Sequence, residues 1–203
     1  MTNSSARDAA QMRLYDRQHR RLYINGAERA RFLAAAEAAS PLKRSLCLTL
    51  LYTGCRISEA LALTPSAVQI GARVITFRTL KQRGTVKMRE VPIPEALVDL
   101  LERCPGVTSA PDLAAPLWQS RGRVLNRITA YRLVKDVMAR AEIVGAQACP
   151  KGLRHGYGIH ATMCGVQLHM LAKWMGHASL TTTQIYADAC GPEERLIAER
   201  MWE

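Results

Sequence analysis

Two short segments of alternating apolar and polar residues interrupt a chain whose other apolar residues recur mostly at helical spacing. The segments are "RVITFRT" and "VKMREVPIP", which are joined through "LKQRG", and Pro92 and Pro94 end the second. Alternation with a period of two is typical of β-strands, and the short connection predicts a hairpin. One hairpin among helices predicts a mainly α fold with a small antiparallel β-sheet.

Helix start and stop signals divide the rest of the chain. Asn25 precedes "GAERARFLAAAEAA" with Glu28 three residues later, which is a capping-box pattern. The next helix is expected to start at Pro41 and to end at Gly54. Further helices are expected in "RISEALALTP", "PEALVDLLERC" and "NRITAYRLVKDVMARAEI". A loop is expected over residues 105–123, and short helices punctuated by Gly152, Gly165, Gly176 and Gly191 are expected after residue 150.

The charge of the chain indicates a polyanionic partner. Lys and Arg number 28 against 17 Asp and Glu, which gives a net charge of +11. Such an excess favours nucleic acid, and an aromatic content of 5% argues against a protein that stacks single-stranded bases. Duplex DNA is therefore the expected partner. The chain has no apolar run long enough for a membrane span and no signal-peptide pattern at its start, so a cytoplasmic protein without membrane contact is expected.

The cysteines and histidines show no metal-ligand spacing. Six cysteines are scattered without a C-x-x-C pair, and we interpret them as reduced thiols, mostly in the core. We therefore expect no metal site and no cofactor.

Arg56 and Glu59 lie three residues apart in "RISEALALTP", on one face of the expected helix. At this spacing Glu59 could orient the Arg56 guanidinium by an ion pair. Taken alone, Arg56 is either a surface arginine whose stem covers apolar residues or a buried, paired one, and a purely structural role is the favoured interpretation.

A second group of basic residues lies in the expected hairpin. Lys81 falls where the first strand turns, and Arg83, Lys87 and Arg89 follow it. A turn lysine is usually only solvated, but the four residues together predict an edge that contacts DNA phosphates.

The motif "KGLRH" places Lys151, Arg154 and His155 near an expected helix start, where the helix dipole favours an anion. His155 is accordingly predicted to contact DNA. The alternative interpretation is a solvated basic patch.

The segment "WMGHASLTTTQIYAD" links His177 to Tyr186 through polar residues. Gly176 is expected to end one helix, and Ser179 to cap a short helix that carries Tyr186. The three threonines are weak helix formers whose hydroxyls are available for backbone or phosphate contacts.

Together these residues form the set that phosphodiester transfer without a metal requires. A tyrosine hydroxyl has a pKa near 10 and needs help to attack phosphorus. Attack produces a highly charged phosphorane, whose oxygens match the forked guanidinium groups of Arg56 and Arg154. A lysine suits the general acid that protonates the leaving oxygen, and His177 could bind a nonbridging oxygen or share the proton of Tyr186.

In these motifs the chain resembles the tyrosine recombinase (phage integrase) family, close in pattern to the Xer recombinases. The matching stretches are "LLYTGCRISEALALT", "GLRHGYGIHAT" and "MGHASLTTTQIYAD", within residues 22–188. The resemblance implies a site-specific recombinase that cuts and rejoins duplex DNA through a 3′-phosphotyrosyl bond, without metal or ATP. It implies the following roles: catalytic Arg56, Lys81, Lys151, Arg154, His177 and Tyr186, with Glu59 in support.

The chain departs from the family pattern at three points. Lys151 stands where a histidine is usual, and it supplies the same positive hydrogen-bond donor. The hairpin is longer than in close relatives, which makes Lys87 an alternative to Lys81 as general acid. About twenty residues, the expected basic arm 1–21, precede the catalytic domain expected over residues 22–203, whose tail helix is expected at about 192–203. The pattern therefore resembles short members without an N-terminal clamp domain, which implies dependence on oligomerisation, with a tetramer expected on DNA, or on accessory DNA-bending proteins.

Two other functions remain open at this point. The chain could be a DNA-binding accessory or regulatory protein that kept the fold with little cleavage activity. It could also be a type IB topoisomerase, which shares the chemistry but relaxes DNA without joining separate duplexes.

Overall fold

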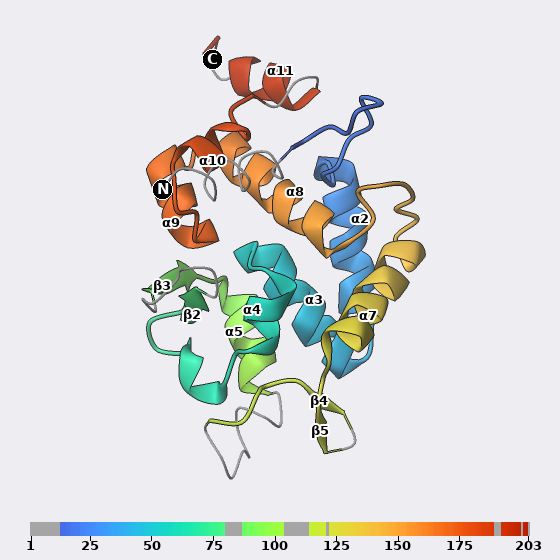
Figure 1. Ribbon diagram of the computed structural model, residues 1–203, viewed down its shortest axis with the longest axis vertical. Coiled ribbons are helices and arrows are strands. Elements are labelled where there is room, and N and C mark those ends of the chain that lie inside the picture. Colours follow the sequence, from blue (N-terminus) through green and yellow to red (C-terminus); the bar gives the residue numbers. More distant parts are fainter. Residues whose placement is uncertain are drawn as a thin grey trace, which may run out of the picture.

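The computed structural model describes residues 13–79, 87–103, 114–120, 122–188, 192–199 and 201–202. These residues form helices packed around and beside a small sheet, in agreement with the predicted fold class (Figure 1). The elements in chain order are helices α2 (Gly26–Glu37), α3 (Pro41–Thr53) and α4 (Ile57–Leu61), a 3-10 helix (Pro65–Ala67), strands β1 (Val68–Gln69), β2 (Val74–Thr79) and β3 (Lys87–Pro92), helix α5 (Glu95–Glu102), strands β4 (Gln119–Ser120) and β5 (Arg123–Val124), and helices α7 (Arg127–Arg140), α8 (Pro150–Met163), α9 (Leu168–Met175), α10 (Thr181–Gln184) and α11 (Pro192–Glu199).

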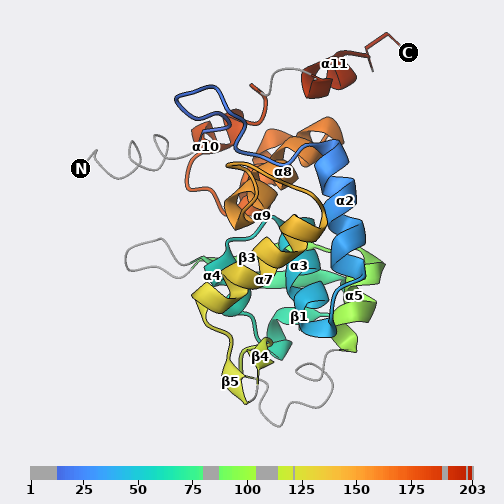
Figure 2. The same ribbon diagram turned by 90° about the vertical axis from the view of Figure 1, so that its right-hand side faces the viewer.

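Helix α3 lies at the centre of the larger apolar core. It contacts α2, α4, α5, α7 and α8, and its residues Leu46, Leu50 and Leu51 are almost completely buried. Figure 2 shows α2, α5 and α7 around it. The helix starts with Pro41 at its first turn and ends at Gly54 in the left-handed conformation, as the sequence predicted. The capping box of Asn25 and Glu28 at the start of α2 is also present.

The predicted hairpin is confirmed as the antiparallel pair β2–β3, in which Phe77 faces Arg89. Two features of the sheets were not predicted from the sequence. Strand β1 adds a third, two-residue strand beside β2, and β4 pairs with β5 inside and just beyond the region expected as a loop. Both are two-residue strands, too short to produce a visible alternation.

Helix α8 runs unbroken over 14 residues, although Gly152 was expected to interrupt the helical pattern. Its glycines instead lie where other segments approach closely. A Cβ on Gly156 would lie 2.8 Å from the carbonyl oxygen of Ile24, and a Cβ on Gly158 would meet the ring of Tyr186. The helix therefore loses some intrinsic stability at its glycines and gains close packing there.

A smaller apolar cluster packs around α8 and α9, apart from the core around α3. Its buried members are Leu14, Tyr23, Ile159, Ala161, Leu171, Met175 and Tyr186. The predicted nucleophile is thus part of a hydrophobic cluster.

The described part of the expected arm is packed against the domain. Leu14 is buried in the smaller cluster, and Arg21 donates hydrogen bonds to Glu28 at 2.6 and 2.9 Å. A buried leucine and an ion pair therefore attach the two ends of residues 13–21 to the domain. Among the described residues, none of the helices is both long and apolar enough to cross a membrane.

Candidate active site

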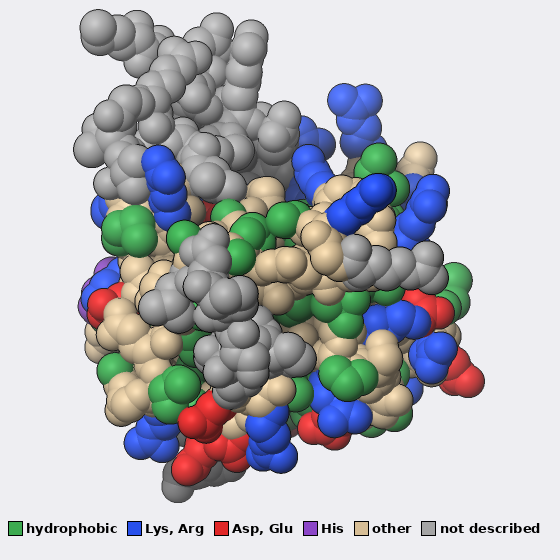
Figure 3. All heavy atoms as spheres, turned by 90° about the horizontal axis from the view of Figure 1, so that it is seen from below, with side chains coloured by type: hydrophobic (Ala, Val, Ile, Leu, Met, Phe, Trp, Pro, Cys, Tyr) green, Lys and Arg blue, Asp and Glu red, His purple; other side chains and the backbone are tan. Residues whose placement is uncertain are grey.

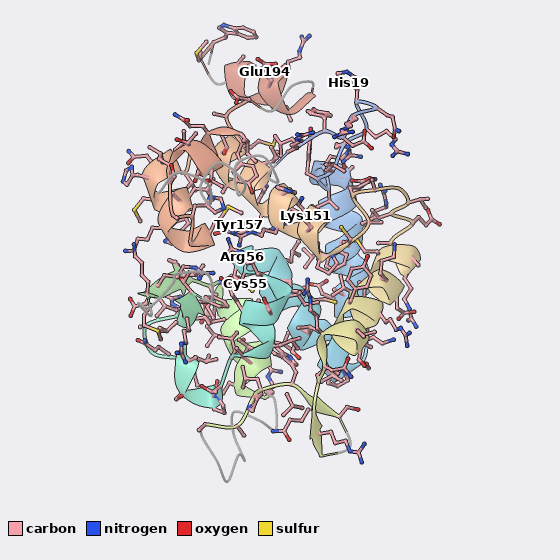
Figure 4. The ribbon with its side chains drawn as sticks, in the orientation of Figure 1. His19, Cys55, Arg56, Lys151, Tyr157 and Glu194 are labelled. Atoms are coloured by element: carbon pink, nitrogen blue, oxygen red, sulfur yellow. The ribbon has the colours of Figure 1, made fainter. Side chains whose placement is uncertain are left out.

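Three separate parts of the chain meet where α8 and α9 face α4. In Figure 4, Arg56, Cys55 and Tyr157 lie close to one another at this junction, and Lys151 lies further along α8. The charges of Arg56 and Arg154 both act to lower the pKa of His177 and the pKa of Tyr186. The two arginines therefore lie near the same histidine and tyrosine.

Arg56 precedes α4 and is held by Glu59. Its Nη1 donates to Glu59 Oε1 at 3.0 Å, and its backbone N–H donates to Oε2 at 2.9 Å. About a quarter of the Arg56 side chain is exposed, whereas Glu59 is buried. The guanidinium is thus anchored on one side and open to a ligand on the other.

Glu59 also binds a second arginine. Arg89 Nη2 donates to Glu59 Oε2 at 2.7 Å, and Arg89 Nε donates to the Trp174 carbonyl at 2.8 Å. Burial alone raises the pKa of Glu59, but the hydrogen bond and charge of Arg89, together with Arg56, hold this pKa below its ordinary value. Glu59 therefore stays ionised and ties α4 to the hairpin.

Arg154 is buried in α8 and spans two helix ends. Its Nη1 donates to the Gly54 carbonyl at 2.6 Å, and its Nη2 donates to the Met175 carbonyl at 2.7 Å. Burial, and then the nearby charge of Arg56, lower the pKa of Arg154 to about 10. The side chain remains charged at neutral pH, and a guanidinium has five N–H groups, so donors remain beyond these two bonds.

His177 follows Gly176, which ends α9 in the left-handed conformation as predicted. Its Nδ1 lies 2.8 Å from Thr183 Oγ1, while its buried Nε2 has no hydrogen-bond partner among the described residues. Burial and the charges of Arg154 and Arg56 lower the pKa of His177 to about 3. When the Thr183 hydroxyl donates to Nδ1, the neutral ring carries its proton on Nε2, which can then donate to an anion.

Tyr186 lies in the turn after α10 rather than within the helix, and the N-cap of α10 is Leu180 rather than Ser179. Its ring is 0% exposed and is stacked on His177, with 6.3 Å between the ring centroids. Burial raises its pKa to about 12, although the charges of Arg154 and Arg56 lower it in part. The hydroxyl lies 3.2 Å from His155 Nδ1.

Two residues predicted as surface DNA contacts are in the interior. Arg89 is 5% exposed and its guanidinium is bonded to protein groups, and His155 is 0% exposed beside Tyr186. Both are too buried to contact a phosphate in this structure, and their role as DNA contacts stays a prediction. The burial of Arg89 could have been predicted from the alternation of β3, because Arg89 shares the inward face of the strand with the apolar Val91 two residues later.

The remaining predicted residues are only partly described. Lys87 is exposed at the start of β3, and Lys151 is exposed near the start of α8, where its charge acts on His155. Lys81 and Arg83 lie outside the described residues.

Sequence reasoning did not single out Thr183, Gly158 or Tyr157. The run of three threonines was the only signal for Thr183, and nothing local distinguished which threonine would face His177.

The described residues contain no cluster of His, Cys, Asp and Glu that could hold a metal ion. Of the six cysteines, Cys47 and Cys55 are buried, Cys149 is partly exposed and Cys164 is exposed. Cys104 and Cys190 lie outside the described residues. The expectation of mostly core thiols is thus met at two of the four described positions.

Comparison with known proteins identifies similar sequences and folds. Residues 23–190 match the phage integrase family. Tyrosine recombinase XerD of Mycobacterium leprae is 34% identical over 164 residues, which cover 74% of this chain and 49% of that protein. The structure of XerA recombinase matches with a TM-score of 0.78 and 25% identity, over 93% of this chain and 66% of that one. The catalytic domain of bacteriophage HP1 integrase matches with a TM-score of 0.58 and 30% identity, over 82% of this chain and 86% of that domain. The chain spans about half the length of the curated relatives it matches.

Proposed function

The chain belongs to the phage integrase family, and we propose that it is a tyrosine-type site-specific DNA recombinase that cuts and rejoins duplex DNA. The observation that carries this proposal is the convergence of Arg56, Arg154 and His177 on Tyr186. Two positive guanidinium groups and a neutral imidazole suit a phosphodiester, because its transition state gains negative charge on the nonbridging oxygens.

The reaction keeps the energy of the broken phosphodiester bond in a new phosphotyrosyl bond. The Tyr186 oxygen attacks the phosphorus and gives up its proton to water, while the bond from phosphorus to the 5′-oxygen breaks and that oxygen takes up a proton from the general acid. The product is a 3′-phosphotyrosyl ester and a free 5′-hydroxyl, and a second 5′-hydroxyl reverses the step on another strand. Arg56 and Arg154 would bind the nonbridging oxygens, and the Nε2 proton of His177 would bind one of them.

Tyr186→Phe tests the nucleophile directly. The substrate is a nicked duplex from the protein's own attachment sequence, whose short fragment leaves after cleavage and so traps the covalent adduct. We expect an adduct with the parent protein and none with Tyr186→Phe. Tyr157→Phe is the matched control, because it removes the hydroxyl of a partly buried tyrosine near Arg154 and should still give the adduct. Equal adduct yields from the parent and Tyr186→Phe would overturn the assignment.

The general acid is assigned to the hairpin, with Lys81 as the first choice and Lys87 as the alternative. A substrate with sulfur in place of the bridging 5′-oxygen needs no proton on the leaving group. Replacing the acid by alanine should slow cleavage of the ordinary duplex and leave cleavage of the sulfur substrate nearly unchanged. If neither Lys81→Ala nor Lys87→Ala shows this difference, the acid lies elsewhere.

The partners proposed are duplex DNA, further copies of this chain and accessory DNA-bending proteins. Strand exchange between two duplexes involves four strands, and one tyrosine serves each strand, so a tetramer is the assembly that the chemistry requires. The mass of the complex on DNA measures this, and a particle with two copies that still completes exchange would contradict it.

A further inference from the structure

The hydroxyl of Tyr186 has no route to a phosphate in this structure. The residue is 0% exposed and belongs to the apolar cluster that also contains Leu14, Ile159 and Leu171. A phosphorus atom cannot contact an oxygen that has no accessible surface. The ring must therefore move before it can attack.

Gly158 makes room for the ring in its buried position. A Cβ on this residue would lie 2.5 Å from Cζ, 2.6 Å from Cε1 and 2.7 Å from Cδ1 of Tyr186. Carbon atoms do not approach this closely without a shift of one group. The ring is thus accommodated only because residue 158 has no side chain.

His155 lies one turn before Gly158 on the same helix and meets the hydroxyl end of the ring. Its Nδ1 is 3.2 Å from the Tyr186 oxygen, whereas its buried Nε2 has no hydrogen-bond partner among the described residues. Burial, and then the charges of Lys151 and Arg154, lower the pKa of His155 to about 3, so that both partners of this contact are neutral at ordinary pH. The one polar group of the Tyr186 ring is therefore hydrogen-bonded in the buried position, and His155 is the residue that supplies this contact.

Part of the segment that carries Tyr186 faces solvent. Thr181, Gln184 and Ala187 are exposed, whereas Thr183 is buried and contacts His177. Displacing the ring therefore breaks its stacking on His177 and its packing in the apolar cluster, as well as its contacts with the seat that Gly158 and His155 provide.

We propose that His155 and Gly158 form a storage seat for Tyr186 on helix α8, and that departure of the ring from this seat precedes DNA cleavage. This inference rests on the proposed function for its consequence in catalysis, but the seat itself can be tested without DNA. His155 and Gly158 are positioning residues in this scheme, because they set the fraction of molecules whose nucleophile is available.

Acetylation by N-acetylimidazole, mapped by peptide mass spectrometry, measures how accessible each tyrosine is. In the parent protein Tyr186 should react as slowly as Tyr23, which is 1% exposed, and far more slowly than Tyr131, which is 44% exposed. Gly158→Ala should raise the reaction rate of Tyr186 about tenfold or more, because the added methyl group displaces the ring. His155→Leu should raise it as well, and His155→Asn, which keeps a hydrogen-bonding group, should restore much of the protection.

Two references separate release of the ring from unfolding. Tyr23 must remain protected in every variant, because it reports on the same apolar cluster. Gly26→Ala is the matched glycine variant, since a Cβ there meets nothing within 4 Å, and it should leave Tyr186 protected. If Tyr186 stays as protected in Gly158→Ala and His155→Leu as in the parent while Tyr23 also stays protected, the seat does not exist.

Cleavage of the nicked duplex then tests the catalytic consequence. At saturating DNA, Gly158→Ala should form the adduct about tenfold faster than the parent if departure from the seat limits the rate. If Tyr186 of Gly158→Ala is acetylated faster than in the parent but forms the adduct no faster, departure from the seat does not limit the rate of cleavage. If neither the parent nor any variant forms the adduct while the acetylation rates are as expected, the proposed function is overturned and the inference about the seat still holds.

Discussion

Thr183 lies against the ring of His177. Its hydroxyl is buried and lies 2.8 Å from Nδ1. When this hydroxyl donates to Nδ1, the neutral imidazole carries its proton on Nε2, and that nitrogen can then donate a hydrogen bond to a phosphate oxygen. One hydroxyl among three adjacent threonines is therefore placed to hold the histidine in this form.

Replacing Thr183 by valine should lower the rate of adduct formation about ten- to hundredfold, the equivalent of one lost hydrogen bond in a buried site. Valine has nearly the same shape, so the apolar packing is kept. Thr183→Ser retains the hydroxyl and should keep most of the activity. An unchanged rate for Thr183→Val, with normal DNA binding, would show that His177 does not depend on this contact.

The buried His155 and the partly buried His177 also predict how stability varies with pH. His155 and His177 have pKa values lowered to about 3 in the folded protein, mainly by burial, whereas histidine in an unfolded chain titrates near 6.5. Below pH 6.5 the unfolded chain therefore binds protons that the folded protein does not. The free energy of unfolding should fall as the pH falls from 6.5 to 5, by on the order of 1 kcal/mol per pH unit for each histidine.

Urea unfolding at a series of pH values measures this slope. Replacing either histidine by asparagine should reduce the slope in this window, before Glu28 and Glu59 begin to titrate. A slope that is the same in both variants and the parent would mean that neither imidazole is kept neutral by burial.

At the scale of elements, the junction between α3 and α4 depends on Gly54. This residue has φ +58°, its carbonyl accepts from Arg154, and a Cβ on it would collide with the ring of Tyr157. The turn thus places Arg56 and supports Arg154 at the same time. Both arginines depend on one position where L side chains are strained.

Gly54→Ala should lower the free energy of unfolding by about 2–4 kcal/mol, from backbone strain and from overpacking against Tyr157. Gly122→Ala is the matched control, because Gly122 also has a positive φ of +71° but nothing lies within 4 Å of its Cβ. The free energy of unfolding of Gly122→Ala should fall by only about 1 kcal/mol. Equal losses in the two variants would show that the contact with Tyr157 is unimportant.

At the scale of the whole molecule, the net charge of +11 predicts binding dominated by phosphate contacts. The lower face in Figure 3 intersperses Lys and Arg with Asp and Glu, so the excess does not form a uniform basic surface there. Exposed lysines such as Lys87 are expected to contact DNA, whereas Lys43 is engaged by Asp136 at 2.6 Å.

The dissociation constant for duplex DNA should rise at least about tenfold between about 50 and 200 mM salt. Lys87→Ala should reduce the slope of log K against log salt concentration by about one, and Lys43→Ala should leave it unchanged. A flat salt response in the parent would contradict binding through the phosphate backbone.

Local patterns were sufficient to predict much of the fold. Periodicity and caps identified the hairpin, the start of α3 at Pro41 and the left-handed turns at Gly54 and Gly176, because each depends on neighbours within a few residues. They did not reveal β1 or β4, whose pairing depends on a partner strand and leaves little trace in two residues.

The sequence by itself determined which side chains could carry phosphoryl transfer, because side-chain chemistry and spacing are properties of the chain. Only the tertiary structure decided where those groups lie and what they touch. Arg89 became a buried partner of Glu59, and His155 became a contact of Tyr186. The reason is that burial and pairing are created by segments far apart in the chain, here α4, the hairpin, α8 and the turn after α10, and no local pattern records which of them will meet.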